Sequence, residues 1–567
     1  MKTNSPIAKC PAFLSLCALS GLCSLAFGQP SSVAPCWSAS GDQANLVFGG
    51  ALGNAGDVNR DGFDDIIIGS TGWAFVFYGS PAGLSQTPDW SVRMQGDING
   101  NGRTVGTAGD VNGDGYADVI VGSPEYWSDT PVGKVEVFYG SSQGLGQTPA
   151  WSVTGPFEFA RAGYAVASAG DVNRDGYADV VVGGRYGDVA WVYYGSRDGL
   201  SQSPSWTAHG RPNSEFGSAV ASAGDVNGDG FADVLIGAHN EFNSPPGSNG
   251  RALLYFGGPD GLQPEPGWSA SPAAGMFFGW DVGSAGDVNR DGFSDIIVGA
   301  PVSASAFVYY GSPTGPRAEP DWTVKSTQSY SSYGVSVARA GDIDGDGFSD
   351  VLVGASEYST DTDLAGQAYL YRGSVEGLAI VPAWTGSGDQ FNGHYGGKVN
   401  AAGDVDGDGG ADFMIGQWGY DTSDLGAGRV FVYCRETSAE LPVVTIEATD
   451  AVAAERFPVP DTATFVVRRS GPSNSDLTVS YSIHGTARNG EDYQALTGTA
   501  SILAGETSAQ ILIEPLNDNV RERVERVMIR INESSPSQSY VVGNPARAVA
   551  VIMDAGSSAR RRASSLR

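Results

Sequence analysis

Acidic nine-residue segments recur along the chain in the pattern Asp-x-[Asp/Asn]-x-Asp-Gly-x-x-Asp. The first copy places side-chain oxygens on Asp57, Asn59, Asp61 and Asp65. Oxygens at positions 1, 3 and 5, a glycine at position 6 and a backbone carbonyl at position 7 are what Ca²⁺ takes from a flexible loop. An EF-hand would complete the shell with Glu at position 12, but Ile68 stands there, so we expect Asp65 at position 9 to do so.

The pattern occurs seven times, always after Ala-Gly and before a short apolar run that ends in glycine. Metal-free Asp-Gly turns are common, because Asp, Asn and Gly are the usual turn residues. Seven copies with the same oxygen positions nevertheless favour calcium. The predicted metal ligands are Asp57, Asn59, Asp61, Phe63, Asp65, Asp110, Asn112, Asp114, Tyr116, Asp118, Asp171, Asn173, Asp175, Tyr177, Asp179, Asp225, Asn227, Asp229, Phe231, Asp233, Asp287, Asn289, Asp291, Phe293, Asp295, Asp342, Asp344, Asp346, Phe348, Asp350, Asp404, Asp406, Asp408, Gly410 and Asp412.

A Pro-x-Trp marker lies 19 or 20 residues before the first Asp of each acidic segment. A short aromatic segment, such as "FVFYG" in the first copy, follows each apolar run. Each unit therefore holds four short strands, within 53 to 62 residues. Four-stranded units repeated seven times are typical of a seven-bladed β-propeller.

These units resemble the FG-GAP repeats of integrin alpha chains, as in Phe278-Gly279 followed by Gly299-Ala300-Pro301. The resemblance extends from about residue 37 to residue 434. It implies a propeller with calcium in its loops and a ligand-binding surface on the face opposite those loops.

The order of the markers predicts how the ring closes. The first Pro-x-Trp segment precedes every acidic loop, and none follows the last loop at Asp404, so the N-terminal strand should complete the seventh blade. Cys36 lies in that first marker and Cys434 ends the last aromatic segment. Because the other three cysteines fall within an expected signal peptide, we predict a disulfide between Cys36 and Cys434 rather than two separate buried thiols.

Residues 1–28 have the features of a secretory signal peptide, since Lys2 and Lys9 precede an apolar segment that ends in small residues. No later segment approaches the ~20 apolar residues of a membrane span. We therefore expect a protein exported to the extracellular space or the periplasm.

After Cys434 the acidic loops give way to alternating strand patterns. The segment "GTARNGEDY", residues 485–493, is similar to Calx-beta domains, and the resemblance places acidic ligands at Glu455, Asp492, Asp518 and Asp554. These acids are fewer than is usual there, which leaves calcium binding by this domain open. The predicted organisation is all-β: signal peptide 1–28, seven-bladed FG-GAP β-propeller 29–436, Calx-beta-like β-sandwich 437–556 and disordered tail 557–567.

The formal net charge of -30 argues against nucleic acid and anionic membranes as partners, because both would be repelled at long range. The four histidines are scattered, and no nucleophile motif is evident. We therefore predict a monomeric, non-enzymatic adhesion or protein-binding module with an extracellular protein or glycan ligand. A propeller lectin is the alternative. A hydrolase or lyase would gain support from a pocket that pairs His239 or His394 with carboxylates.

Connections between the apolar run after each acidic loop and the following aromatic segment differ in length: they are short in units 1, 3 and 5 and long in units 2, 4, 6 and 7. The long connections carry aromatic residues beside acids and should lie on the face opposite the acidic loops, since successive strands of a blade are antiparallel. Exposed aromatics of this kind often dominate binding, although each could instead pack on its neighbouring blade. The predicted partner-binding residues are Tyr126, Trp127, Phe242, Tyr358, Trp418 and Tyr420.

Overall fold

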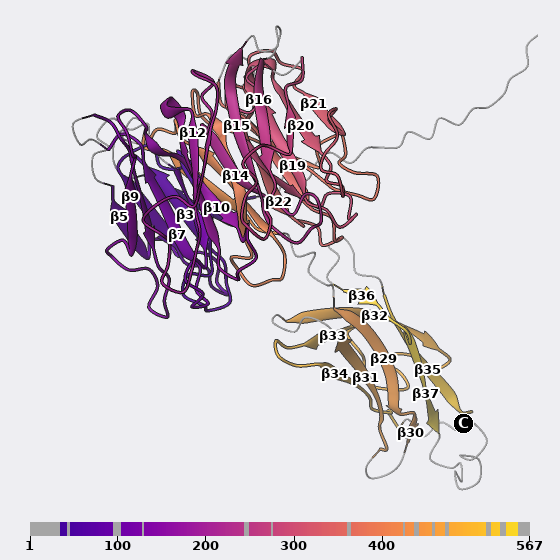
Figure 1. Ribbon diagram of the computed structural model, residues 1–567. Helices are drawn as coiled ribbons and strands as arrows, with labels where there is room; N and C mark the ends of the chain where they lie inside the picture. The colour runs from indigo at the N-terminus through magenta and orange to yellow at the C-terminus, as the bar shows by residue number, and fades with distance from the viewer. Residues whose placement is uncertain are drawn as a thin grey trace, which may run out of the picture. The chain divides into compact units, whose positions relative to one another are not determined.

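The chain divides into two compact units, Met1–Arg435 and Glu436–Arg567, in the computed structural model (Figure 1). The predicted signal peptide and C-terminal tail lie outside the residues that the structure describes. The described residues are 34–41, 46–94, 104–126, 130–242, 249–273, 276–359, 364–422, 426–435, 442–455, 460–470, 476–517, 523–532 and 540–553.

Seven four-stranded antiparallel sheets make up the described part of the first unit. Six sheets contain consecutive strands: β2 (Ala51–Gly56), β3 (Asp65–Ser70), β4 (Trp73–Phe77), β5 (Trp90–Arg93); β6 (Thr104–Gly109), β7 (Asp118–Ser123), β8 (Lys134–Phe138), β9 (Trp151–Thr154); β10 (Ala162–Gly170), β11 (Asp179–Gly184), β12 (Val189–Tyr193), β13 (Trp206–His209); β14 (Ala219–Gly224), β15 (Asp233–Phe242), β16 (Asn249–Tyr255), β17 (Trp268–Ala270); β18 (Val282–Gly286), β19 (Asp295–Ala300), β20 (Ser305–Tyr309), β21 (Trp322–Lys325); and β22 (Tyr333–Gly341), β23 (Asp350–Ala355), β24 (Gln367–Tyr371), β25 (Trp384–Ser387). The last sheet joins β26 (Tyr395–Gly403), β27 (Asp412–Gln417) and β28 (Arg429–Tyr433) to the N-terminal β1 (Trp37–Ser40). In the described part of this unit, the 3-10 turns η1 (Arg185–Gly187) and η2 (Pro301–Ser303) lie between strands.

The sheets form a closed ring. The first strand of each sheet contacts the first strand of the next, and β26 contacts β2. We number the sheets as blades 1 to 7 in chain order, with β2–β5 as blade 1. The acidic segments connect the first and second strands of each blade, and we call them loops 1 to 7. The predicted all-β fold with a β-propeller is thereby confirmed.

The tryptophan of each Pro-x-Trp marker joins neighbouring blades, which explains its regular spacing. Trp90 begins the outermost strand of blade 1, and its indole N–H donates to Gly146 O at 2.9 Å. Its ring also packs edge-on against Phe138 of blade 2, with centroids 5.0 Å apart. The second strands of six blades, such as β3, are buried at every position because neighbouring blades cover both of their faces.

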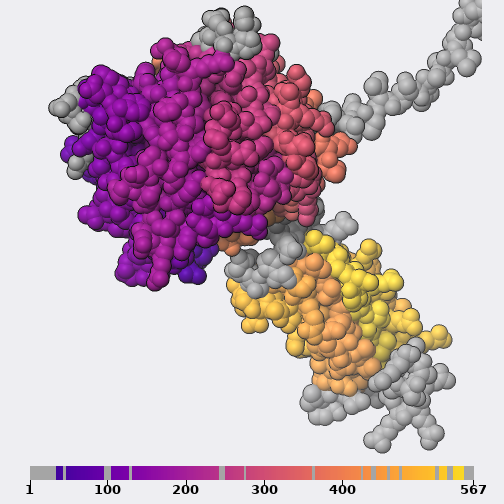
Figure 2. All heavy atoms as spheres, viewed as in Figure 1, coloured from indigo at the N-terminus to yellow at the C-terminus, as the bar shows by residue number. Residues whose placement is uncertain are grey.

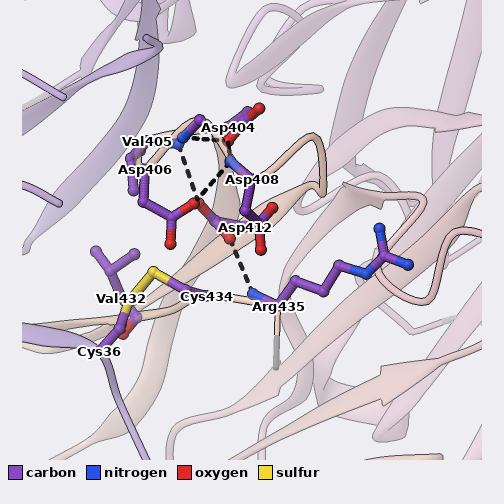
Figure 3. Close-up of a disulfide and its surroundings, with 10 residues drawn as sticks. Cys36, Asp404, Val405, Asp406, Asp408, Asp412, Val432, Cys434 and Arg435 are labelled. Atoms are coloured by element: carbon purple, nitrogen blue, oxygen red, sulfur yellow. Dashed lines mark hydrogen bonds between the residues drawn. A yellow bond between two sulfur atoms is a disulfide. The ribbon is translucent and has the colours of Figure 1, made fainter. Parts of the chain in front are cut away.

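The N-terminal strand completes blade 7, as predicted. β1 pairs antiparallel with β28 from Trp37↔Val432 to Ser40↔Arg429. Cys36 and Cys434 form a disulfide at the end of this pairing, with their Cα atoms 5.7 Å apart (Figure 3).

The second unit is a β-sandwich. One described sheet has the order β34-β31-β29-β36 and the other β30-β37-β35-β32-β33, and both contribute buried side chains to one core. Its strands are β29 (Val443–Asp450), β30 (Val452–Ala454), β31 (Ala463–Ser470), β32 (Leu477–Gly485), β33 (Thr499–Ile502), β34 (Ser508–Ile513), β35 (Glu525–Ile531), β36 (Val541–Val542) and β37 (Arg547–Met553).

In the space-filling view each unit forms a continuous body, coloured from indigo to red-orange for the propeller and from orange to yellow for the sandwich (Figure 2). Among the described residues, no helix is long and apolar enough to cross a bilayer.

Candidate calcium loops and the opposite face

Each acidic loop is folded by hydrogen bonds from its own backbone to its own carboxylates. In loop 1, Asp57 accepts from the N–H groups of Asp61 (3.0 Å) and Gly62 (2.9 Å). Asn59 Oδ1 accepts from Asp61 N at 2.9 Å, and Asp61 Oδ1 accepts from Phe63 N at 3.1 Å. These bonds fix the oxygens of positions 1, 3 and 5 without using all of their lone pairs, so the oxygens remain able to hold a cation.

The same geometry recurs in every loop. The position-6 N–H donates to the position-1 carboxylate in all seven copies, at 2.8–3.0 Å. In loop 7, carboxylate oxygens of Asp404, Asp406 and Asp408 lie within 4.8 Å of one another (Figure 3). Cys434 also lies near Asp406 and Asp412, but its sulfur is bonded to Cys36 and is therefore excluded as a ligand.

The position-9 aspartates differ from the other ligands because they are buried. In loop 1, Asp65 is fully buried, and its two oxygens accept from Val58 N and Gly79 N, both at 2.9 Å. Burial raises the pKa of all seven position-9 carboxyls to about 7, and the two backbone hydrogen bonds offset this only in part. A divalent cation would supply the opposite charge that these buried groups require, so both the oxygen set and the electrostatics fit Ca²⁺.

Neighbouring loops are also bonded to one another, which the sequence did not reveal. The position-8 N–H donates to the position-1 carbonyl of the preceding loop, as in Ala117 N to Asp57 O at 3.1 Å. At the junction of blades 7 and 1 the position-8 residue is Asp64, whose N–H donates to Asp404 O at 3.0 Å. The Asp64 carboxylate in turn accepts from Asp404 N at 2.9 Å. The point of ring closure thus carries an additional carboxylate beside loop 7.

The residues predicted to bind a partner are partly buried wherever the structure describes them. Trp418 stacks on His394, with ring centroids 4.1 Å apart, and Tyr358 packs against a core between blades 5 and 6. Tyr126 and Tyr420 are half-buried beside basic side chains. The side chains of Trp127 and Phe242 lie outside the described residues. At the described positions, each of these aromatic side chains is therefore partly occupied by contacts within the propeller.

A different set of aromatic residues is exposed on that face. Tyr330, Phe391 and Phe159 are 87%, 58% and 53% exposed. They lie in the connections that enter the first strands of blades 6, 7 and 3, opposite the calcium loops. Tyr330 and Phe159 have positive φ angles of 64° and 60°, which turn the chain in a way that side-chain-bearing residues seldom adopt. The sequence carries no plain signal for such a conformation, so these residues were missed.

A cavity of about 1160 Å³ lies between the first strands of the blades. Among its lining residues, His239 forms hydrogen bonds with Ser218 Oγ through Nδ1 (2.9 Å) and with Glu215 through Nε2 (2.7 Å). Arg185 pairs with the same Glu215 carboxylate at 2.6 Å. Burial alone would raise the pKa of Glu215, but the hydrogen bond from His239 and the charge of Arg185 lower it overall. With the imidazole proton on Nε2, Nδ1 would accept a hydrogen bond from Ser218 Oγ.

Comparison with known families agrees with this architecture. A family model described as FG-GAP-like repeat matches residues 110–182, 171–236 and 287–353, and one described as Calx-beta domain matches residues 439–556. The chain carries FG-GAP repeats followed by a Calx-beta domain. The repeats coincide with blades whose acidic loops have just been described, and the Calx-beta match coincides with the sandwich.

Curated relatives of the FG-GAP region are integrin alpha chains. Integrin alpha pat-2 of Caenorhabditis briggsae is 34% identical over 221 residues, which are 33% of this chain and 18% of the relative. Integrin alpha-5 of Xenopus laevis is 31% identical over 228 residues, 37% of this chain and 21% of the relative. The chain thus spans about a fifth of the length of these relatives. Among solved structures, the apo-form Calx CBD1 domain is 24% identical and covers 20% of this chain and 97% of its own, with a TM-score of 0.17.

Within the Calx-beta domain, the structure does not bring the four predicted acids together as a described set. Glu455 is buried, and Asp492 accepts from Arg488 N at 2.6 Å. Asp518 and Asp554 lie outside the described residues. Calcium binding by this domain therefore stays open.

Proposed function

We propose that this protein is exported and acts as a calcium-dependent adhesion or protein-binding module. The similarity of its FG-GAP repeats to integrin alpha chains supports this class of function. The observation that carries the proposal is the set of exposed aromatic side chains opposite the calcium loops, namely Tyr330, Phe391 and Phe159. Exposed aromatics on one face are characteristic of an interaction surface.

In this proposal each of the seven loops holds one structural Ca²⁺. The predicted ligands include 23 carboxylates, which would repel one another without cations. Seven ions would change the formal net charge from -30 to -16. Dissociation constants of ~0.1–1 mM, as in other extracellular modules, would suffice outside a cell. Because the ions bind only the folded loops, they would stabilise the propeller.

The experiment that tests the binding face compares two triple variants of the full chain. In the first, Phe159, Tyr330 and Phe391 are each replaced by serine. Adhesion of cells to the immobilised protein, measured with calcium and with chelator, should require calcium and should be lost in this variant. Unchanged adhesion would show that another surface binds.

The matched control removes exposed apolar side chains from the calcium face. Val375, Ile380 and Val381 are 79%, 73% and 70% exposed, and Ser374 N of the same segment donates to Val288 O beside loop 5. Replacing these three residues by serine should leave adhesion intact. A glycan array probed with the same variants separates a lectin from a protein-binding module, since a lectin would bind isolated glycans.

A hydrolase is the second candidate, because Ser218 and His239 line the cavity and His239 also pairs with Glu215. Ser218 Oγ could attack an ester carbonyl while its proton passes to His239 Nδ1 and then to the leaving alcohol; water would release the acyl group and restore the serine. Covalent labelling of Ser218 by a fluorophosphonate, abolished in Ser218→Ala and His239→Gln, would support this function. Absence of labelling in the wild type would exclude it. We rank adhesion above hydrolysis because the FG-GAP repeats are similar to integrin alpha chains.

A further inference from the structure

Loops 1, 3 and 5 carry an arginine at position 4, where the other loops carry glycine. Arg60, Arg174 and Arg290 all have φ of 58°, a left-handed conformation that costs any residue other than glycine free energy. The glycines of the other loops have φ between 72° and 76° at the same position. The arginines thus occupy a position whose backbone favours glycine, which points to a role for the side chain.

Each of these side chains reaches across the blade boundary to the next loop. A Cβ atom placed on Gly115, at position 6 of loop 2, would lie only 2.5 Å from Arg60 Nη1, so the guanidinium fills the space above this glycine. The equivalent distance is 2.6 Å for Arg174 at Gly230 and 2.6 Å for Arg290 at Gly347.

In the remaining loops no described arginine lies over position 6, although Arg435 packs against Gly410 at position 7 of loop 7. At position 6 of loops 1, 3, 5 and 7, no atom lies within 4 Å of the corresponding Cβ point in the described structure: Gly62, Gly176, Gly292 and Gly409. The seven loops therefore fall into two classes. We call loops 2, 4 and 6 the covered loops and loops 1, 3, 5 and 7 the open loops.

The covered glycine is part of the candidate ligand cage. Gly115 N donates to the position-1 carboxylate of Asp110 at 2.8 Å, so the Arg60 guanidinium packs on a residue that is hydrogen-bonded to a predicted calcium ligand. A cation at this place has two opposite effects: it attracts the empty carboxylates and repels an incoming Ca²⁺. Loop 6 has further cationic contacts, since Arg372 pairs with Asp344 at 3.1 Å and Arg435 donates to Asp344 O at 3.0 Å.

We propose that Arg60, Arg174 and Arg290 are built-in counter-cations that divide the calcium sites into four tighter open sites and three weaker covered sites. When calcium is scarce, the arginines partly neutralise the carboxylate charge of the covered loops. Among the described residues, the open loops have no such counter-charge over position 6. For a charge about one Debye length (~8 Å) from the ion in a solvent-exposed dielectric, the repulsion corresponds to about a two- to fivefold loss of calcium affinity at each covered loop. This inference rests on the proposed binding of calcium by the loops.

The test is a triple substitution in the full chain, with Arg60, Arg174 and Arg290 each changed to glutamine. This removes the charge and keeps a long side chain at each position. The matched control changes the same residues to lysine, which keeps the charge. Calcium titration by calorimetry should resolve sites of about two- to fivefold different affinity in the wild type and the lysine variant. In the glutamine variant the calcium affinity of loops 2, 4 and 6 should rise about two- to fivefold, and its melting temperature in excess chelator should be lower by about 2 °C.

A third variant keeps the inference testable if the glutamine protein does not fold. Changing the three arginines to glycine reproduces the Asn-Gly-Asp-Gly sequence that loops 2 and 4 already use, so the backbone is compatible. It should show the same gain in affinity. Equal calcium affinity in the wild type and a charge-free variant would overturn the two-class inference while leaving calcium binding intact. Absence of any calcium binding in the wild type would instead overturn the proposed function.

Discussion

Removing the disulfide that closes blade 7 should weaken the propeller measurably. The perturbation is the double substitution Cys36→Ser and Cys434→Ser. The two cysteines are 398 residues apart. In the chain-entropy model, a loop of that length restricts the unfolded chain by about 6 kcal/mol at 25 °C. This value is an upper limit that applies only if the whole ring unfolds in one step.

The structure also defines a smaller, local opening. β1 contributes four paired residues to blade 7, and Trp37 Nε1 donates to Ser85 O of blade 1 at 2.9 Å. Without the disulfide, β1 can leave this edge while the other three strands of the blade stay paired. The free energy of this local opening should then fall below that of global unfolding.

Two measurements distinguish these cases. Urea unfolding followed by tryptophan fluorescence should show a lower midpoint for the double variant, and hydrogen exchange should increase in residues 34–41 before the other blades exchange. Wild-type protein treated with reductant should behave like the variant. If exchange in residues 34–41 and the urea midpoint are both unchanged, strand pairing alone closes the ring and the reasoning fails.

Three further predictions concern calcium, pH and blade packing. Excess chelator should lower the melting temperature of the propeller, since each site of ~0.1–1 mM dissociation constant contributes about 0.4–1.4 kcal/mol at 1 mM free calcium; an unchanged melt would contradict structural calcium. Burial against Trp418 lowers the pKa of His394 below 6.5, so the stability contributed by its neutral form should be present above pH 6.5 and lost as pH falls below it; His394→Asn should flatten this part of a stability profile. A Cβ on Gly299 would lie 2.0 Å from Gly334 O of the next blade, so Gly299→Ala should cost about 3 kcal/mol, whereas Gly106→Ala, where no atom lies within 4 Å, should be neutral or slightly stabilising in urea unfolding.

The sequence was sufficient to predict the propeller because its signals are local and repeated. Each blade contains a Pro-x-Trp strand, an acidic loop and an aromatic strand in fixed order, and the place of Trp37 before the first loop predicted its pairing in blade 7. The disulfide followed from the same order. These features depend on local motifs and on the number and order of their repeats, and both can be read directly from the sequence.

The contacts between blades could not be read in this way. His239 on β15 lies 21 and 24 residues after Ser218 and Glu215, and it meets them only because the connection between β13 and β14 packs beside β15. The reach of Arg60 to Gly115 likewise depends on the angle between blades 1 and 2. Exposure of Tyr330 depends on a loop conformation with positive φ, for which its sequence gives no turn signal.

The pairing of β1 with β28 has a consequence for the order of synthesis. β1 is among the first strands of the propeller to be made, and its partner follows almost 400 residues later. At about 5–20 residues per second, the ribosome takes roughly 20 to 80 seconds to cover that interval. Throughout it, the Trp37 strand has no partner, while six blades can form in succession from neighbouring strands. The nascent propeller is therefore an open arc with a free edge at each end. Formation of the last blade is the step at which a chaperone or a second nascent chain would compete with β1 for pairing with β28.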